Sequence, residues 1–348
     1  MNLTRPIEGF AVYALSKRTL SQYVRGECRR RLRLDLYAGD ATRKELGIPV
    51  KDVARPGLAL LVEQGRQFER EKFGELAQVF AGRVTHGAVT APRPGEESAF
   101  GKILLDDHLD ACGSDHFLVE AEYVVTDPFI GAHGLRDLVD GSAFVPGSGA
   151  TLRFAAVRPD ILQVVPPAGA PRHVITPSGE VHTIAANDPR LGLRIIDIKL
   201  TGEPSPSHFA ELAYYGMTLA AWLERTGRDG RFVVLKDAAV WPGKHEASEI
   251  RRREFEDRSN GVTNRSLARY LEGLGEDLET MPAEVVLGRV RRFFAVDLCE
   301  AILAPDWQAL PAAAAATTWA TVGRPASTTT PSCPRKPRVR RTAGPPPR

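Results

Sequence analysis

One short stretch near the middle of the chain, Arg194-Ile195-Ile196-Asp197-Ile198-Lys199, limits most strongly what this sequence can fold into. Its β-branched residues predict a strand, expected over residues 193–200. Side chains alternate faces along a strand, so Asp197 and Lys199 project together on one side while their isoleucine neighbours face the core. Burying a carboxylate and an ammonium on an apolar strand costs free energy, so the pair predicts a function that uses both charges.

Metal-assisted hydrolysis is one such function. A carboxylate is a ligand that Mg²⁺ prefers, and a lysine beside it can position or help deprotonate an attacking water and offset phosphate charge. An acid-x-Lys triplet taken alone is more often an ion pair at a surface or a strand end. The residues around the triplet must therefore decide between the two interpretations.

Asp160 stands 37 residues before Asp197, where one β-like segment meets the next. The intervening residues 166–192 are punctuated by Pro and Gly, as in a hairpin excursion, which would let residues 160–165 lie beside the strand at 193–200. Two carboxylates from neighbouring strands would form a site for a divalent cation. The alternative is that Asp160 follows Pro159 in an ordinary turn.

The remaining pattern predicts an α/β or α+β domain over residues 1–311, with a central mixed β-sheet flanked by helices. We expect helices over residues 16–37, 56–80, 207–225, 264–274 and 283–303. We expect further strands over residues 117–125, 152–157 and 232–240. Ser205 and Ser207 are candidate caps for the helix at 207–225.

Residues 312–348 differ from the rest in composition. They are rich in Ala, Thr, Pro and Arg and contain seven basic residues but no acidic one. Such a segment is expected to be disordered. It is either a genuine basic tail that adds nonspecific DNA affinity or the product of a frameshift in a GC-rich gene.

The charge balance bears on possible partners. The whole chain has a formal net charge of +3, but without the tail 39 basic residues face 43 acidic ones, a net charge of about −4. The domain is therefore not a generally basic nucleic-acid binder, and any DNA contact depends on local patches. The chain has no apolar run that could cross a bilayer and no signal pattern, and its four cysteines form no disulfide framework, so we expect a cytoplasmic protein.

Five motifs occur in a characteristic order along residues 16–240. They are Ser16 with Leu20, Tyr23 and Cys28; Gly65-x-x-Phe68-Glu69; Asp160; Asp197-Ile198-Lys199; and Glu211-x-x-x-Tyr215. Together they resemble the RecB-like branch of the PD-(D/E)XK nucleases, which includes the nuclease domains of RecB and AddAB and the CRISPR-associated adaptation nucleases.

The resemblance implies a restriction-endonuclease-like core and a Mg²⁺- or Mn²⁺-dependent DNA nuclease of repair, recombination or defence. It implies a DNA substrate, including single-stranded DNA, and a helicase or larger complex as partner. The resemblance assigns Asp160, Asp197 and Lys199 to catalysis, Glu69, Asp160 and Asp197 to the metal, and Glu211 and Tyr215 to DNA. We add the Ile198 carbonyl as a further metal ligand and Arg25, Arg29 and Arg30, from the basic stretch of the first predicted helix, as further contacts to DNA.

The sequence departs from that family at three places. Glu69 replaces a frequent histidine, Glu211 replaces the usual glutamine, and Arg29 follows Cys28 where proline is usual. Some relatives hold a [4Fe–4S] cluster, but here only Cys28 is suitably placed and no Cys-x-x-Cys exists, so no cluster is expected.

Two other functions are open from the sequence. One is a catalytically inactive DNA-binding or scaffold subunit of a larger complex, which the substitutions at Glu69 and Glu211 favour. The other is a site-specific restriction-type endonuclease, although the chain shows no separate base-reading module.

Overall fold

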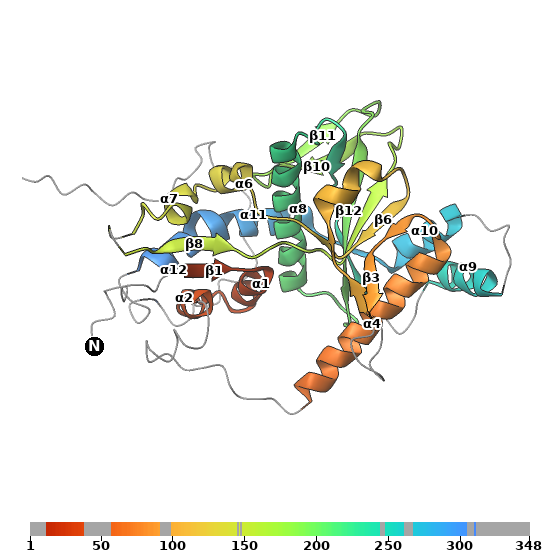
Figure 1. Ribbon diagram of the computed structural model, residues 1–348, viewed down its shortest axis with the longest axis horizontal. Coiled ribbons are helices and arrows are strands. Elements are labelled where there is room, and N and C mark those ends of the chain that lie inside the picture. The colour runs from red at the N-terminus through yellow and green to blue at the C-terminus, as the bar shows by residue number, and fades with distance from the viewer. Residues whose placement is uncertain are drawn as a thin grey trace, which may run out of the picture.

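The computed structural model of the chain describes residues 12–37, 57–90, 99–144, 146, 148–243, 248–260, 267–304 and 310. The tail predicted at residues 312–348 lies outside them. At the centre is a seven-stranded mixed sheet (Figure 1). Its strands, in spatial order, are β15 (Glu279–Thr280), β14 (Ala239–Pro242), β12 (Leu191–Lys199), β9 (Ile161–Val165), β6 (His116–Val119) and β2 (Val84–Thr85), with β13 (Phe232–Val234) also paired to β12.

Strand β12 is the axis of the sheet. It pairs antiparallel with β9, with Ile195 opposite Leu162 and Ile196 opposite Ile161. The chain between them forms the small antiparallel hairpin of β10 (Arg172–Ile175) and β11 (Val181–Ile184), as expected for the Pro- and Gly-rich excursion. On its other side β12 pairs in parallel with β13 and β14, which the chain reaches through helix α8 (Pro206–Thr226).

Helices cover both faces of the sheet, so both faces of β12 are buried. Leu193 and Ile195 belong to the core shared with α8, whereas Ile196 and Ile198 belong to the core under α4 (Leu58–Val79) and α10 (Leu267–Asp277). Figure 1 shows α8 upright between the sheet and the smaller parallel pair of β1 (Val12–Leu15) and β8 (Thr151–Phe154). Helix α9 (Glu249–Ser259) packs against α10.

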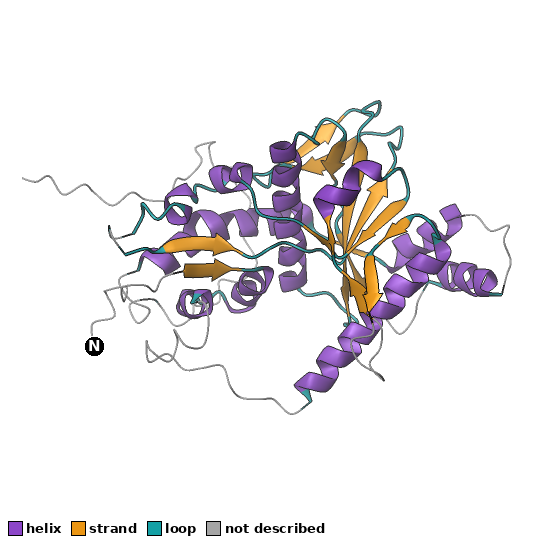
Figure 2. Ribbon diagram, viewed as in Figure 1, coloured by secondary structure: helices purple, strands orange, loops and turns teal. Residues whose placement is uncertain are grey.

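Apart from the central sheet, β3 (Gly87–Thr90) and β4 (Ala99–Gly101) form a separate antiparallel pair, and β5 (Ile103–Leu104) and β7 (Ala121–Glu122) form a separate parallel pair (Figure 2). The remaining helical segments are α1 (Lys17–Gly26), α2 (Arg29–Leu36), α5 (Leu105–His108), η1 (Leu109–Ala111), α6 (Asp127–Ala132), α7 (Arg136–Val139), α11 (Ala283–Arg292), η2 (Phe293–Asp297) and α12 (Leu298–Leu303).

The single helix predicted over residues 16–37 is wrong. It is two helices, because Glu27 adopts the left-handed conformation (φ 44°) and its N–H bonds back to the Tyr23 carbonyl, which ends α1. Cys28 then caps α2, its sulfur accepting from the Arg31 N–H. The break lets α2 turn away from α1, which a helical periodicity alone does not reveal.

Two predicted strands are also divided. Residues 117–125 form β6 and β7, separated at Glu120, which has a positive φ of 54°. Residues 232–240 form β13, which pairs with residues 191–193 of β12, and the start of β14, which pairs with residues 196–199. Helix α4 begins at Leu58 after Gly57 in a left-handed cap, and Pro56, predicted to open it, lies outside the described residues. Ser205 is the cap of α8.

Candidate functional site

The two aspartates predicted to form a site meet where β9 begins and β12 ends. Ile198 would face Pro159 in the antiparallel register, and its backbone N–H instead donates to Asp160 Oδ2 at 2.7 Å. The Asp160 carboxylate therefore accepts the hydrogen bond from Ile198 where the backbone pairing of β9 with β12 ends. Asp160 is 5 % exposed and Asp197 is fully buried, so the site sets both carboxylates into the protein rather than on its surface.

Three carboxylates lie around the Lys199 ammonium. Its Nζ lies 2.7 Å from Asp197 Oδ2, 4.0 Å from Asp160 Oδ2 and 3.9 Å from Glu211 Oε2. Burial lowers the pKa of Lys199, but the charges of Asp197, Asp160 and Glu211 outweigh burial and raise the pKa well above its usual value. Lys199 is therefore an ammonium at neutral pH.

Asp197 is the least satisfied member of the site. Both of its oxygens are buried and accept no hydrogen bond from the residues that the structure describes. The contact of Lys199 with Asp197 Oδ2 is an ion pair at 2.7 Å. An ionised carboxylate in a buried position normally has its lone pairs filled, so Asp197 has free capacity to bind a cation or another donor.

Two carboxyl groups at the site, those of Asp160 and Glu69, have pKa values raised toward neutral pH. Burial, followed by the charge of Asp197, raises the pKa of Asp160 to about 6. Glu69, on α4, is half-buried, and burial followed by the charge of Asp160 raises its pKa to about 7. Carboxylates raise one another's pKa when they lie close together in a region of low dielectric. Such an arrangement is typical of a site that binds a cation.

Helix α8 brings Glu211 and Tyr215 to the same region. The two residues are one turn apart on one helix face and both are buried. The Tyr215 hydroxyl has no hydrogen-bond partner among the described residues. Burial, followed by the charges of Asp197, Asp160 and Glu211, keeps the pKa of Tyr215 far above its usual value, so the phenol is protonated.

The three arginines predicted to contact DNA have partners within the chain. Arg25 is exposed and its Nε donates to Ser207 Oγ at 2.9 Å, at the start of α8. Arg29 forms ion pairs with Asp297 and Glu300, each at 2.6 Å. Arg30 donates two hydrogen bonds to the Leu310 carbonyl. Arg29 and Arg30 thus bind α2 to the C-terminal part of the described chain.

The sequence reasoning missed three residues at the site. Lys17, the first residue of α1, lies with its Nζ 5.2 Å from the centre of the Tyr215 ring. The charge of Glu120 contributes to the raised pKa of Glu69, and Glu120 forms an ion pair with Arg158 at 2.8 Å. His208 caps α8, and burial followed by the charge of Lys199 lowers its pKa to about 4. None of the three belongs to a motif, and only the fold brings them here.

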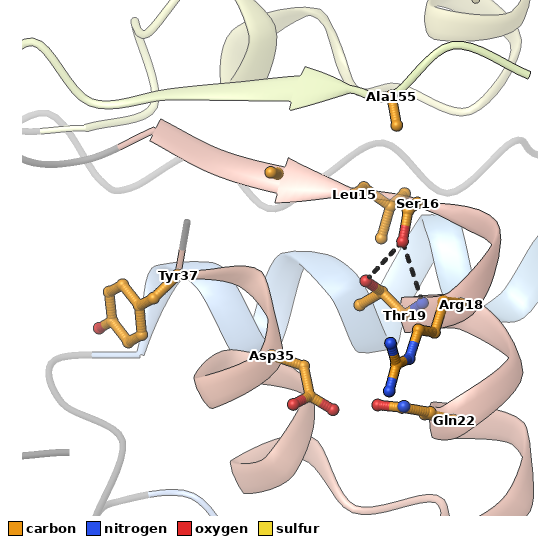
Figure 3. A pocket seen from close by; sticks show the side chains of 9 residues that line it. Leu15, Ser16, Arg18, Thr19, Gln22, Asp35, Tyr37 and Ala155 are labelled. Atoms are coloured by element: carbon orange, nitrogen blue, oxygen red, sulfur yellow. Dashed lines mark hydrogen bonds between the residues drawn. The ribbon is translucent and has the colours of Figure 1, made fainter. Parts of the chain in front are cut away.

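A separate hollow of about 280 Å³ lies between the end of β1, α1 and α2. Figure 3 shows Arg18, Gln22 and Asp35 pointing toward one another there. With its amide nitrogen toward Asp35, Gln22 donates to Asp35 Oδ2 at 2.8 Å and accepts from Arg18 Nε at 3.0 Å. These contacts join α1 to α2.

Within the described part of the chain, no three or more His, Cys, Asp or Glu side chains are gathered closely enough to hold a metal ion by themselves. No disulfide joins the described cysteines Cys28, Cys112 and Cys299 to one another, and Cys333 lies outside the described residues. The site thus has at its centre two carboxylates, Asp160 and Asp197, and one ammonium, with further acids around them.

Comparison with known proteins identifies no relative: no family model, no curated protein and no solved structure matches this chain. Among the described helices, none combines the length and the apolar composition needed to cross a membrane.

Proposed function

We propose that this protein is a metal-dependent nuclease that hydrolyses phosphodiester bonds in DNA, with Asp160, Asp197 and Lys199 as its catalytic residues. The observation that carries the proposal is the buried Asp197 carboxylate, which accepts no hydrogen bond from the described residues and lies beside Asp160 and Lys199. A merely structural ion pair would be expected to satisfy both carboxylate oxygens. The proposal includes a restriction-endonuclease-like identity for the mixed sheet and its flanking helices.

The donor set fits Mg²⁺ or Mn²⁺. Mg²⁺ keeps several of its waters and is usually bound through one or two carboxylates, so a cluster of three acids is not required. Asp160 and Asp197 would hold the ion together with the Ile198 carbonyl, and Glu69 would do so through a water or after moving closer. Bound there, the ion would supply Lewis-acid polarisation of the phosphate and a lowered pKa for an attacking water.

The protein's own groups account for the rest of the chemistry. Lys199 is a protonated amine within 4.0 Å of both aspartates, so it can orient an attacking water and offset the charge that develops on a phosphoryl oxygen. The protonated Tyr215 hydroxyl, which bonds to none of the residues that the structure describes, is a donor at the same place. Arg25 is the predicted DNA-contacting arginine with the greatest exposure, whereas Arg29 and Arg30 are half-buried.

Purified protein incubated with single- and double-stranded DNA in Mg²⁺, Mn²⁺ or EDTA tests the proposal. We expect cleavage with either metal and none with EDTA. DNA binding without turnover under every condition would contradict the proposal and favour a catalytically inactive scaffold in a larger complex. The carboxylate cluster argues against that alternative, because a scaffold gains nothing from an unsatisfied buried Asp197. A role in repair, recombination or defence, with a helicase partner in the cytoplasm, extends the same proposal.

A further inference from the structure

Lys17 is the one basic residue of α1 that faces the carboxylate cluster. It follows Ser16, whose side chain caps α1 at the point where β1 ends. Helix α1 packs along α8, and this contact brings the Lys17 ammonium over the face of the Tyr215 ring at 5.2 Å. The position is therefore fixed by two packed helices rather than by a loose surface side chain.

Apart from its contact with the face of the Tyr215 ring, the Lys17 ammonium makes no hydrogen bond and no close ion pair with the described residues. The nearest acids already have other cations, because Asp197 lies 2.7 Å from Lys199 and Glu120 lies 2.8 Å from Arg158. Burial lowers the pKa of Lys17, but the charges of Asp160, Asp197 and Glu211 raise it above its usual value, so the amine stays charged. A half-buried ammonium with three free N–H donors indicates that an anion from outside the chain binds to it.

We propose that Lys17 binds a phosphate of the nucleic-acid substrate, donating to a non-bridging oxygen beside the Asp160–Asp197 cluster. This inference rests on the proposed function, because it takes the substrate to be a phosphodiester. A phosphate placed here meets four carboxylates: Asp160, Asp197, Glu211 and Glu120. The repulsion would be severe with Lys199 as the only amine, and a second ammonium reduces it.

The neighbouring Arg18 provides a matched control on the same helix. It is exposed, and its Nε bonds to Gln22 in the separate hollow between α1 and α2 (Figure 3). Replacing Arg18 removes the same formal charge one residue away without touching the carboxylate cluster. A loss caused only by reduced net charge would therefore occur in both variants.

The test measures binding of a fluorescent single-stranded oligonucleotide by anisotropy, in Ca²⁺ and in EDTA, for wild type, Lys17→Met, Lys17→Arg and Arg18→Met. We expect Lys17→Met to bind about tenfold more weakly, with the slope of log K against log salt reduced by about 1. Lys17→Arg should retain most of the affinity and Arg18→Met should resemble wild type. Equal affinity of Lys17→Met and wild type, or no binding by wild type, would overturn the proposal.

A second set of oligonucleotides, each with one phosphate replaced by a neutral methylphosphonate, separates contact from a structural effect. If Lys17 touches a phosphate, one position will weaken wild type but not Lys17→Met. The same penalty at every position in both proteins would overturn the proposal. If wild type cleaves DNA but shows no phosphate position specific to Lys17, the proposed nuclease function stands and the proposed role of Lys17 is contradicted. If such a position is found but wild type cleaves no DNA, the phosphate contact stands and the nuclease function is contradicted.

Discussion

The backbone N–H of Ile198 donates to the carboxylate of Asp160 at 2.7 Å, which ties the residue before β9 to the residue between Asp197 and Lys199. This bond fixes the position of one acid relative to the other two functional side chains. It also makes Asp160 a structural acceptor as well as a proposed ligand, and the two roles can be separated by substitution.

Asp160→Asn is expected to stabilise the metal-free protein above pH 6, whereas Asp160→Ala is not. Because the folded-state pKa of Asp160 is raised to about 6 from 3.8, the folded protein binds this proton more tightly than the unfolded chain does. Stability is therefore lost as pH rises from about 4 to about 6, and asparagine removes that loss while still accepting from Ile198, a gain of about 1–3 kcal/mol.

Urea denaturation in EDTA at pH 5 and pH 8 measures this. Asparagine and alanine variants that are equally destabilised at pH 8 would contradict the account, because the raised pKa would then have no energetic consequence in the folded state.

Cleavage should depend on pH in a direction set by the same carboxyl groups. Protons on Asp160 and on Glu69, with pKa values of about 6 and about 7, compete with a divalent cation. We expect the rate at fixed low Mg²⁺ to rise between pH 5.5 and pH 8, and the midpoint to move to lower pH as Mg²⁺ is increased. A midpoint independent of metal concentration would show that these protons do not compete with it.

Tyr215→Phe is expected to lower DNA cleavage without lowering stability. The hydroxyl is buried and has no partner among the described residues, so its removal costs the fold nothing and can relieve about 1–3 kcal/mol of desolvation. The ring, which packs in the core and under Lys17, is kept. Thermal melting and cleavage rates of the same preparation test this, with Tyr214→Phe, whose hydroxyl is also unpartnered, as the control. Equal activity of wild type and Tyr215→Phe would show that the Tyr215 hydroxyl has no role in cleavage.

Arg251→Met is expected to destabilise the fold by about 3–5 kcal/mol at neutral pH. Arg251 is 5 % exposed and forms ion pairs with Glu75 of α4 and Asp277 of α10. Its loss leaves the buried Asp277 carboxylate without this cation and leaves Glu75 with its ion pair to Lys72 at 3.3 Å. Denaturant unfolding measures the change, and exposed Arg253→Met on the same helix is the control. A change below 1 kcal/mol would show that the cluster does not hold α9 and α10 to α4.

The part of the site that the sequence predicts well is its local part. Strand alternation correctly places Asp197 and Lys199 on one face, and the Pro- and Gly-rich excursion correctly predicts the pairing of β9 with β12. Both follow from properties of a few consecutive residues. The prediction of a central mixed sheet flanked by helices is confirmed for the same reason, since each element has its own periodicity.

What depends on distant packing was not predictable. Lys17 reaches the site only because α1 packs on α8, and no residue spacing along the chain predicts that contact. The division of residues 16–37 into two helices depends on the left-handed backbone of Glu27, a conformation with no glycine to mark it. The sequence suggests that Arg29 and Arg30 form a surface basic cluster. In the fold, Asp297 and Glu300 of the C-terminal helical segments pair with Arg29, and the Leu310 carbonyl accepts from Arg30.

The most direct test of the central claim is the Mg²⁺-dependent cleavage rate of Asp197→Asn compared with wild type and with Asp237→Asn. The control alters a carboxylate that is 48 % exposed and pairs with Arg194 of β12, the strand that carries Asp197. Circular dichroism and thermal melting would establish that all three proteins are folded. The account predicts that Asp197→Asn loses at least about a hundredfold in rate while Asp237→Asn resembles wild type. Cleavage by a folded Asp197→Asn at the wild-type rate would contradict it.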